Sequence, residues 1–126
     1  MTNNAPKFTS PTFLLDHISD TLKFYEANVD DPHGGFYQNF LDNGDVYDKG
    51  TRHLVSSTRF VFNYARAYQE FGEAKYLARV KSGIAFIRSA HYIPETGGYN
   101  WLIDVQDGVV SVKDQTNHCY GFAFVI

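Results

Sequence analysis

Apolar residues recur at helical spacing in three segments of the chain. The first segment follows a Ser-Pro pair of the kind that starts helices, and it predicts a helix over residues 11–28. Two further segments predict helices over 51–71 and 73–91, with Gly72 as a natural stop between them. The positions of these stripes are Leu14, Ile18, Leu22 and Tyr25, then Leu54, Thr58, Val61, Ala65 and Tyr68, then Leu77, Val80, Ile84, Ile87 and His91.

Two segments between these helices have the pattern of β-hairpins. Short runs of β-prone residues at 36–41 and 99–103 are followed by Asn-Gly at 43–44 and Asp-Gly at 107–108. Such pairs favour the positive φ angles of tight hairpin turns. We therefore expect hairpins around 35–48 and 98–112. A fourth helix is expected over 115–126, and residues 1–10 are expected to form a flexible segment.

The hairpins belong to an internal repeat. Gly-Gly-Phe-Tyr at 34–37 recurs as Gly-Gly-Tyr-Asn at 97–100, and each copy leads into a turn pair and then a His-containing aromatic segment. The repeated unit is helix, hairpin loop, helix, and units of this kind need neighbours to bury their apolar faces. Because only two units are present and residues 119–126 form an uncapped apolar run, we expect most of the protein to lie outside this sequence.

Composition restricts the class of protein. The chain of 126 residues fits one domain, and 44% hydrophobic with 20% charged residues is ordinary for a soluble protein. A net charge of −3 argues against a nucleic-acid partner, and no apolar run is long enough to span a membrane. With no secretory signal pattern and one cysteine, a cytoplasmic protein is expected. The 17% aromatic content fits either an aromatic core or rings that line a sugar pocket.

Four segments in order resemble the N-acylglucosamine 2-epimerase family. They are the Gly-Gly-aromatic hairpins at 34–37 and 97–101, Lys-Gly-Thr-Arg-His-Leu-Val-Ser-Ser-Thr-Arg-Phe at 49–60, and Asn-His-Cys-Tyr at 117–120. The set is most similar to the mannose isomerase and YihS-type aldose–ketose isomerase branch. The resemblance covers nearly the whole chain, which would correspond to about the first third of a family member.

The resemblance implies an all-α fold, the (α/α)6 barrel of twelve helices, with long loops over a central sugar pocket. Residues 1–126 would be the N-terminal portion of that single catalytic domain, holding about its first four helices with short β-hairpins in the loops. A homodimer is possible for the complete protein.

The same resemblance implies isomerisation of a monosaccharide without metal or redox cofactor. A base removes the C2 proton of an aldose, and an ene-diol-like intermediate is reprotonated at C1 to give the ketose or at C2 to give the epimer. The two histidines that serve as acid and base in the family lie on later helices, so residues 1–126 alone are expected to be inactive. Alone, the fragment is also expected to be poorly soluble or oligomeric.

Arg59 is the catalytic candidate that the resemblance indicates. The matching arginine of the family points into the pocket and holds substrate oxygens near the reacting carbons, a task for which a charged fork of donors is suited. Spacing alone also allows a solvated outer face for its polar stripe. That stripe contains Arg52, Ser56, Arg59, Asn63 and Arg66, of which Asn63 is a substrate-binding candidate and Arg52 and Arg66 are expected to be structural.

His118 and Trp101 are further substrate-binding candidates. His118 either bonds a sugar hydroxyl or packs at the start of the fourth helix, and Trp101 either stacks on a sugar or fills the core. Two family positions differ here, with Thr116 in place of a tyrosine and Val55 in place of a tryptophan. These departures leave the sugar open.

Three other functions compete with the isomerase. One is a 2-epimerase of N-acylglucosamine or cellobiose. A second is a glycoside hydrolase on the same barrel, which would need paired carboxylates where the second helix has Arg59 and Asn63. The third is a non-catalytic carbohydrate-binding module. A metal site is not expected, because the histidines and the single cysteine lack metal-ligand spacing.

Overall fold

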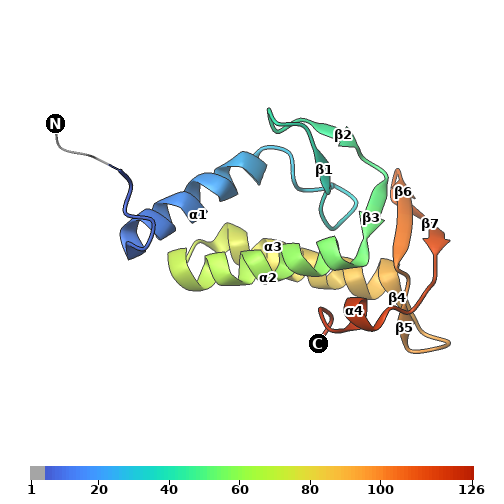
Figure 1. Ribbon diagram of the computed structural model, residues 1–126. Coiled ribbons are helices and arrows are strands. Elements are labelled where there is room, and N and C mark those ends of the chain that lie inside the picture. The colour runs from blue at the N-terminus through green and yellow to red at the C-terminus, as the bar shows by residue number, and fades with distance from the viewer. Residues whose placement is uncertain (1–4) are drawn as a thin grey trace.

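The computed structural model describes residues 5–126, which form helices and small antiparallel sheets. Figure 1 shows α2 and α3 side by side, α1 along one side of this pair, and the strands gathered at one end. The elements in order are α1 (Pro11–Glu26), β1 (Asn39–Phe40), β2 (Val46–Asp48), β3 (Thr51–His53), α2 (Leu54–Phe71), α3 (Ala74–Phe86), the π-helical turn η1 (Ile87–His91), β4 (Tyr92–Ile93), β5 (Gly98–Tyr99), β6 (Leu102–Gln106), β7 (Val109–Asp114) and α4 (Cys119–Phe122).

Helix α1 confirms the first predicted helix. Ser10 precedes it and its hydroxyl accepts from the N–H of Phe13, while Pro11 occupies the first turn. No residue of α1 is fully buried, and its apolar residues Leu14 and Ile18 are 46% and 44% exposed. Of the segment expected to be flexible, residues 1–4 lie outside the described residues, and residues 5–10 contain no helix or strand.

Helix α2 begins three residues later than predicted. Residues 51–53 are not helical because they form β3, whose backbone pairs with β6 in the second repeat. The helix ends as expected at Gly72, which has a φ of 69° and donates its N–H to the carbonyl of Tyr68. The buried face is rotated from the predicted stripe, since Tyr68 is 38% exposed whereas Tyr64 and Ala67 are buried.

The third predicted helix changes character near its end. The α-helix ends at Phe86, and residues 87–91 form a π-helical turn in which the N–H of Tyr92 bonds to the carbonyl of Ile87. A π turn holds one more residue than an α turn and so changes the direction of the side chains beyond it. Here it places His91 completely inside the protein.

Both predicted hairpins are present. β1 pairs with β2, and β6 pairs with β7 through a turn in which Asp107 and Gly108 have φ angles of 50° and 80°. The sequence did not predict that β3 joins this second hairpin in a sheet of order β3-β6-β7, or that β4 pairs with β5. The two repeats are thus linked by a shared sheet.

The predicted fourth helix over 115–126 is wrong in extent, since α4 covers only Cys119–Phe122. The carboxylate of Asp114 accepts from the N–H of Thr116, and the Asn117 side chain accepts from the N–H of Tyr99. These bonds hold residues 114–118 in a bend, because side-chain acceptors of this kind compete with helix formation.

Two apolar clusters form the core. One contains Val29, Phe36, Tyr64, Ala67 and Tyr76 and lies between the first hairpin loop, α2 and α3. The other contains Phe86, Ala90, Ile103 and Val105 and joins the end of α3 to the shared sheet. Gly35 allows the first loop to lie directly against Phe86 of the second cluster. Its φ is 73°, and a Cβ there would lie 2.6 Å from the ring of Phe86.

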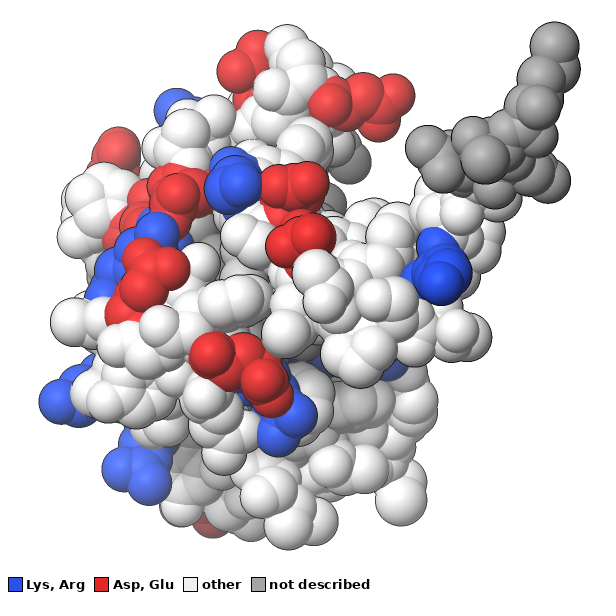
Figure 2. Space-filling model, turned by 90° about the vertical axis from the view of Figure 1, so that its left-hand side faces the viewer, with Lys and Arg blue, Asp and Glu red and all other residues white. Residues whose placement is uncertain are grey.

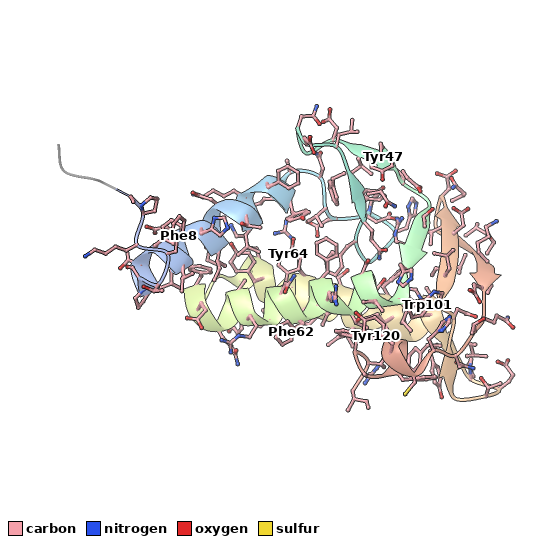
Figure 3. All side chains as sticks on the ribbon, in the orientation of Figure 1. Phe8, Tyr47, Phe62, Tyr64, Trp101 and Tyr120 are labelled. Carbon is pink, nitrogen blue, oxygen red and sulfur yellow. The ribbon has the colours of Figure 1, made fainter. Side chains whose placement is uncertain are left out.

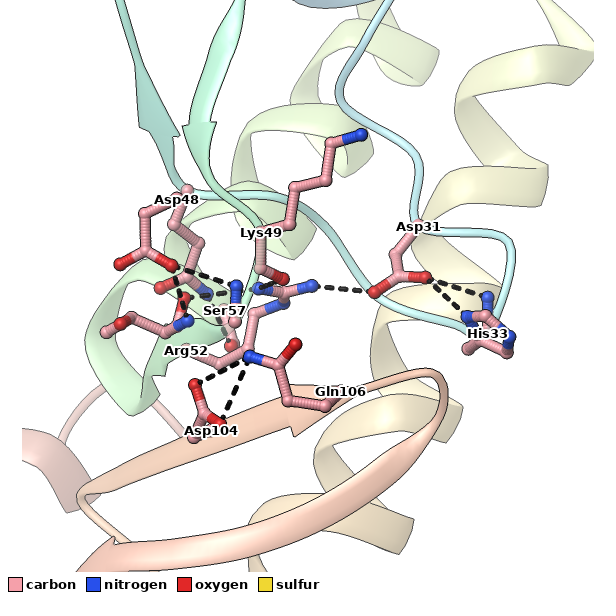
Figure 4. Close-up of polar contacts among 11 residues, drawn as sticks. Asp31, His33, Asp48, Lys49, Arg52, Ser57, Asp104 and Gln106 are labelled. Carbon is pink, nitrogen blue, oxygen red and sulfur yellow. Dashed lines mark hydrogen bonds and ion pairs between the residues drawn. The ribbon is translucent and has the colours of Figure 1, made fainter.

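A buried ion pair connects the first loop to β3. Arg52 is 0% exposed and donates to the carboxylate of Asp31 at 2.6 Å and to the carbonyl of Lys49 at 2.7 Å (Figure 4). Its guanidinium also lies 4.9 Å from the centre of the Tyr37 ring. Arg52 therefore does not belong to the polar stripe of α2 in which the spacing placed it, although the structural role expected for it is consistent with these contacts.

Candidate functional site

Arg59 lies on the exposed side of α2 and contacts the α4 segment. Its Nη2 donates to the Tyr120 hydroxyl at 2.9 Å, and its guanidinium lies 4.9 Å from the centre of the Phe124 ring. Between residues 5 and 126 no carboxylate forms an ion pair with Arg59. A phenol and an aromatic face thus orient a charged fork whose remaining donors are free to bind an oxygen-rich ligand.

Trp101 contacts two imidazole rings, that of His53 before α2 and that of His118 before α4. The centre of its ring system is 4.2 Å from that of His53 and 4.3 Å from that of His118 (Figure 3 labels Trp101 and Tyr120). Trp101 also packs on α4, where a Cβ at Gly121 would lie 2.7 Å from the indole. Only glycine at this position allows the indole to lie this close to α4.

The two imidazoles differ in surroundings. His53 is half-buried, and its Nδ1 accepts from the N–H of Val55 at 3.3 Å, which caps α2 and leaves the ring proton on Nε2. Burial lowers the pKa of His53, and the charge of nearby His118 lowers it further. His118 precedes α4, is exposed, and makes no capping hydrogen bond. The cluster therefore offers one fixed neutral donor and one imidazole open to solvent.

The structure brings three of the four candidates together around α4. Arg59 reaches α4 through Tyr120, and Trp101 and His118 contact each other beside it. Asn63 is not part of this group: it is exposed and lines the groove between α1 and α2. A role for it in sugar binding remains a prediction without support from these contacts.

Three residues of this cluster were missed as site candidates. Tyr120 and Phe124 lie in the apolar run 119–126, where the sequence indicated only a helix. Both residues contact Arg59, which lies 61 positions before Tyr120 in the sequence. A contact over such a distance is not visible in any local sequence pattern. The repeat could have indicated His53, because it precedes α2 as His118 precedes α4.

A separate apolar groove of about 560 Å³ separates α1 from α2. Its walls contain exposed apolar side chains of both helices, among them Leu14 and Ile18 from α1 and Phe62, 64% exposed, from α2. The groove is distinct from the Arg59 and Trp101 cluster.

The distribution of charged side chains and of metal-ligand residue types does not indicate a further site among the described residues. In the face drawn in Figure 2, described acidic and basic side chains are interspersed instead of forming a single-sign patch. Within residues 5–126 no group of three or more His, Cys, Asp or Glu side chains could hold a metal ion. No helix in the same range is long and apolar enough to cross a membrane.

Comparison with characterised proteins gives relatives over almost the whole chain. It is 50% identical over 121 residues to a D-mannose isomerase of Marinomonas mediterranea, covering 96% of this chain and 29% of that protein. A cellobiose 2-epimerase of Ruminococcus albus is 31% identical over 114 residues, covering 90% of this chain and 28% of its own length. The chain therefore spans a little under a third of these relatives.

Solved structures of the same kinds of enzyme also have a similar backbone. A crystal structure of D-mannose isomerase, 50% identical, superposes with a TM-score of 0.89 over 96% of this chain and 30% of that one. A sugar epimerase from a ruminal bacterium, 26% identical, gives a TM-score of 0.73 over 88% of this chain and 29% of that one. The profile of the N-acylglucosamine 2-epimerase (GlcNAc 2-epimerase) family matches residues 35–126. The chain belongs to the N-acylglucosamine 2-epimerase family.

Proposed function

We propose that the protein containing this chain is an aldose–ketose isomerase that interconverts a mannose-like aldose with its ketose. The observation that supports this most is the 50% identity to D-mannose isomerase across nearly the whole chain, together with the close superposition of the two backbones. The Arg59 and Trp101 cluster agrees with it, because it combines a charged donor, imidazoles and an aromatic face, the groups that suit a sugar.

In this proposal Arg59 acts on the reacting carbons. Its guanidinium binds the oxygens at C1 and C2, where negative charge develops when the C2 proton is removed. Tyr120 fixes the direction of the guanidinium through the 2.9 Å hydrogen bond. The acid and base that move the proton are histidines expected outside residues 1–126, so this chain supplies binding and charge stabilisation.

Trp101 and His118 are proposed to hold the rest of the sugar. The indole offers an apolar face for the C–H side of a pyranose, and the exposed His118 can bond a hydroxyl. Asn63 would bind the sugar only if the site extended into the groove between α1 and α2, which Asn63 lines.

We further propose that the complete protein closes into the (α/α)6 barrel. The apolar groove between α1 and α2 supports this, since later helices of such a barrel would cover its exposed Leu14, Ile18 and Phe62. Charged substitutions at Ile18 should then destabilise the longer protein much more than this chain. Equal loss in both would contradict closure over this groove.

A 2-epimerase is the second candidate. The specific observation in its favour is the 31% identity to cellobiose 2-epimerase over 90% of this chain. Both reactions begin with the same C2 proton transfer and differ in the carbon that is reprotonated.

The test is NMR of the longer protein incubated in D₂O with D-mannose and, separately, with cellobiose. Fructose with deuterium at C1 is the expected product from mannose. Glucose from mannose, or a new disaccharide from cellobiose, would favour the epimerase. The absence of any ketose, epimer or deuterium incorporation with either sugar would overturn both functions.

Two expectations about the complete protein belong to the same proposal. A cytoplasmic location and a homodimer are expected from the sequence and its resemblance. Fractionation of the producing cell and analytical ultracentrifugation of the longer protein test them.

A further inference from the structure

A buried chain of hydrogen bonds links four segments beneath the candidate site. The Gln38 amide nitrogen is 2.9 Å from Ser57 Oγ, and Ser57 Oγ is 3.0 Å from Nε2 of His91. Nδ1 of His91 is 2.8 Å from the carbonyl of Asn100. Ser57 is 2% exposed and His91 is 0% exposed, so the central bond is closed to water.

The groups at the two ends fix the direction of every bond. The Asn100 carbonyl can only accept, so Nδ1 of His91 donates and its Nε2 accepts from the Ser57 hydroxyl. At the other end the N–H of His53 donates to Oε1 of Gln38 at 2.6 Å, so the amide nitrogen of Gln38 faces Ser57 and donates. The burial that lowers the pKa of His91 to about 4 also keeps this imidazole neutral.

The chain ends on the backbone that carries Trp101. Asn100 is bound twice by His91, since its N–H also donates to the His91 carbonyl at 2.7 Å. The next residue, Trp101, accepts from the N–H of Leu54 at 3.0 Å, which ties it to the first turn of α2. Ser57 lies on the same helix, one half-turn before Arg59.

We propose that Gln38, Ser57 and His91 are positioning residues that hold Trp101 against the start of α2, at a fixed place relative to Arg59. The placement of Trp101 in a sugar site rests on the proposed function, whereas the positioning itself rests on the hydrogen bonds. Ser57 and His91 are not a nucleophile and base, since neither side chain is accessible to a substrate.

Breaking the chain at Ser57 tests the inference. Trp101 is the single tryptophan of the 126 residues, so the fluorescence of this chain reports on it alone, measured at low concentration after circular dichroism has verified that wild type and variants are folded. In Ser57→Ala, His91 and Gln38 each lose a partner, and the Asn100 backbone is held less firmly. We expect acrylamide quenching of Trp101 to rise at least about two-fold, with a red-shifted emission, as the local segment opens more often.

Three variants separate positioning from general loss of stability. Ser56→Ala removes a neighbouring, half-buried hydroxyl that makes no hydrogen bond to any residue between 5 and 126, and should leave quenching unchanged. Val29→Ala weakens the other core cluster and should lower the unfolding midpoint without changing Trp101 in the folded chain. Gln38→Ala should reproduce a weaker form of the Ser57→Ala change, and it serves if Ser57→Ala does not fold.

Unchanged quenching in both folded Ser57→Ala and folded Gln38→Ala, or an equal change in Val29→Ala, would overturn the positioning inference. In the longer protein, Ser57→Ala should also raise the KM for the sugar by about ten-fold, with a smaller change in kcat, because the misplaced group binds substrate and does not move protons. Altered fluorescence with an unaltered KM would leave the positioning intact and remove Trp101 from the proposed sugar site.

Discussion

The two repeated units share a framework and differ in the chemistry placed on it. Each has a Gly-Gly pair, a β-hairpin and a histidine that immediately precedes a helix, His53 before α2 and His118 before α4. Gln38 and Trp101 occupy matching positions after the Gly-Gly pairs. Gln38 accepts from the backbone N–H of His53, whereas the ring of Trp101 packs against that of His118 at an interplanar angle of 54°.

The matching residues of the two units thus differ in role: those of the first stabilise the fold, and those of the second are accessible to a ligand. In the first unit, the polar groups are paired, the buried Arg52 with Asp31 and the half-buried Gln38 with the buried Ser57. In the second unit, the histidine is exposed and the aromatic ring is only half-buried. At these matching positions the first unit therefore fixes the geometry and the second presents groups that a ligand can reach. Elsewhere the units are mixed, since Arg59 on α2 of the first unit is exposed and His91 of the second is buried.

The largest expected effect is on the free energy of unfolding, when the buried ion pair of the first unit is broken. Asp31→Ala leaves the 0% exposed Arg52 without its carboxylate, so the free energy of unfolding should fall by about 3–5 kcal/mol. Urea denaturation followed by circular dichroism measures it. The control is Asp20→Ala, which removes an exposed pair with Lys23 and should change the free energy of unfolding far less, because water screens such pairs. Similar losses in both variants would contradict this account.

The next effect concerns catalysis. Arg59→Ala should lower the turnover of the longer protein by about 10²-fold or more, the usual scale for losing one charge-stabilising donor. Folding should change little, because Arg59 is exposed. Arg59→Lys should restore little activity, since the planar fork is lost. Arg66→Ala, an exposed arginine of the same helix bound to Gln69 and Glu70, is the control and should keep turnover within a few-fold.

A smaller effect is a pH dependence of stability caused by His91. Its pKa of about 4 lies below the unfolded value of 6.5, so the neutral form is favoured in the folded state. The stabilisation from the neutral imidazole is complete above pH 6.5 and is lost as the pH falls toward 4. By pH 5 the free energy of unfolding should have fallen by about 2 kcal/mol. The lowered pKa of His53 adds to this slope in the same direction.

Unfolding free energies measured between pH 7 and pH 5 test this dependence. His91→Gln should flatten the slope, whereas His17→Gln, at an exposed position of α1, should keep it. A slope unchanged by His91→Gln would place the proton uptake elsewhere.

The smallest expected effect compares the two matching histidines. His53→Ala removes the cap of α2 and should cost about 1 kcal/mol. His118→Ala removes an exposed ring that caps nothing, and should cost less than about 0.5 kcal/mol. Thermal unfolding of both variants under one condition measures the difference. If His118→Ala cost as much as His53→Ala, the separation between the two units would be lost.

The sequence by itself determined the local structure and the family. Helical periodicity located α1, α2 and α3, the Asp-Gly pair located the β6–β7 turn, and the repeat located both hairpins. These features depend on neighbours a few residues apart, which the order of residues shows directly. The resemblance also named the family correctly, because four motifs occur in the same order.

Only the tertiary structure decided which polar residues are buried and which meet. Arg52 appeared to extend the stripe of Arg59, but β3 takes it out of the helix and Asp31 pairs with it inside. The start of α2 and the length of α4 were likewise set by pairing with distant segments. Burial and pairing of charges depend on contacts between residues far apart in the chain, and neither spacing nor composition specifies those partners.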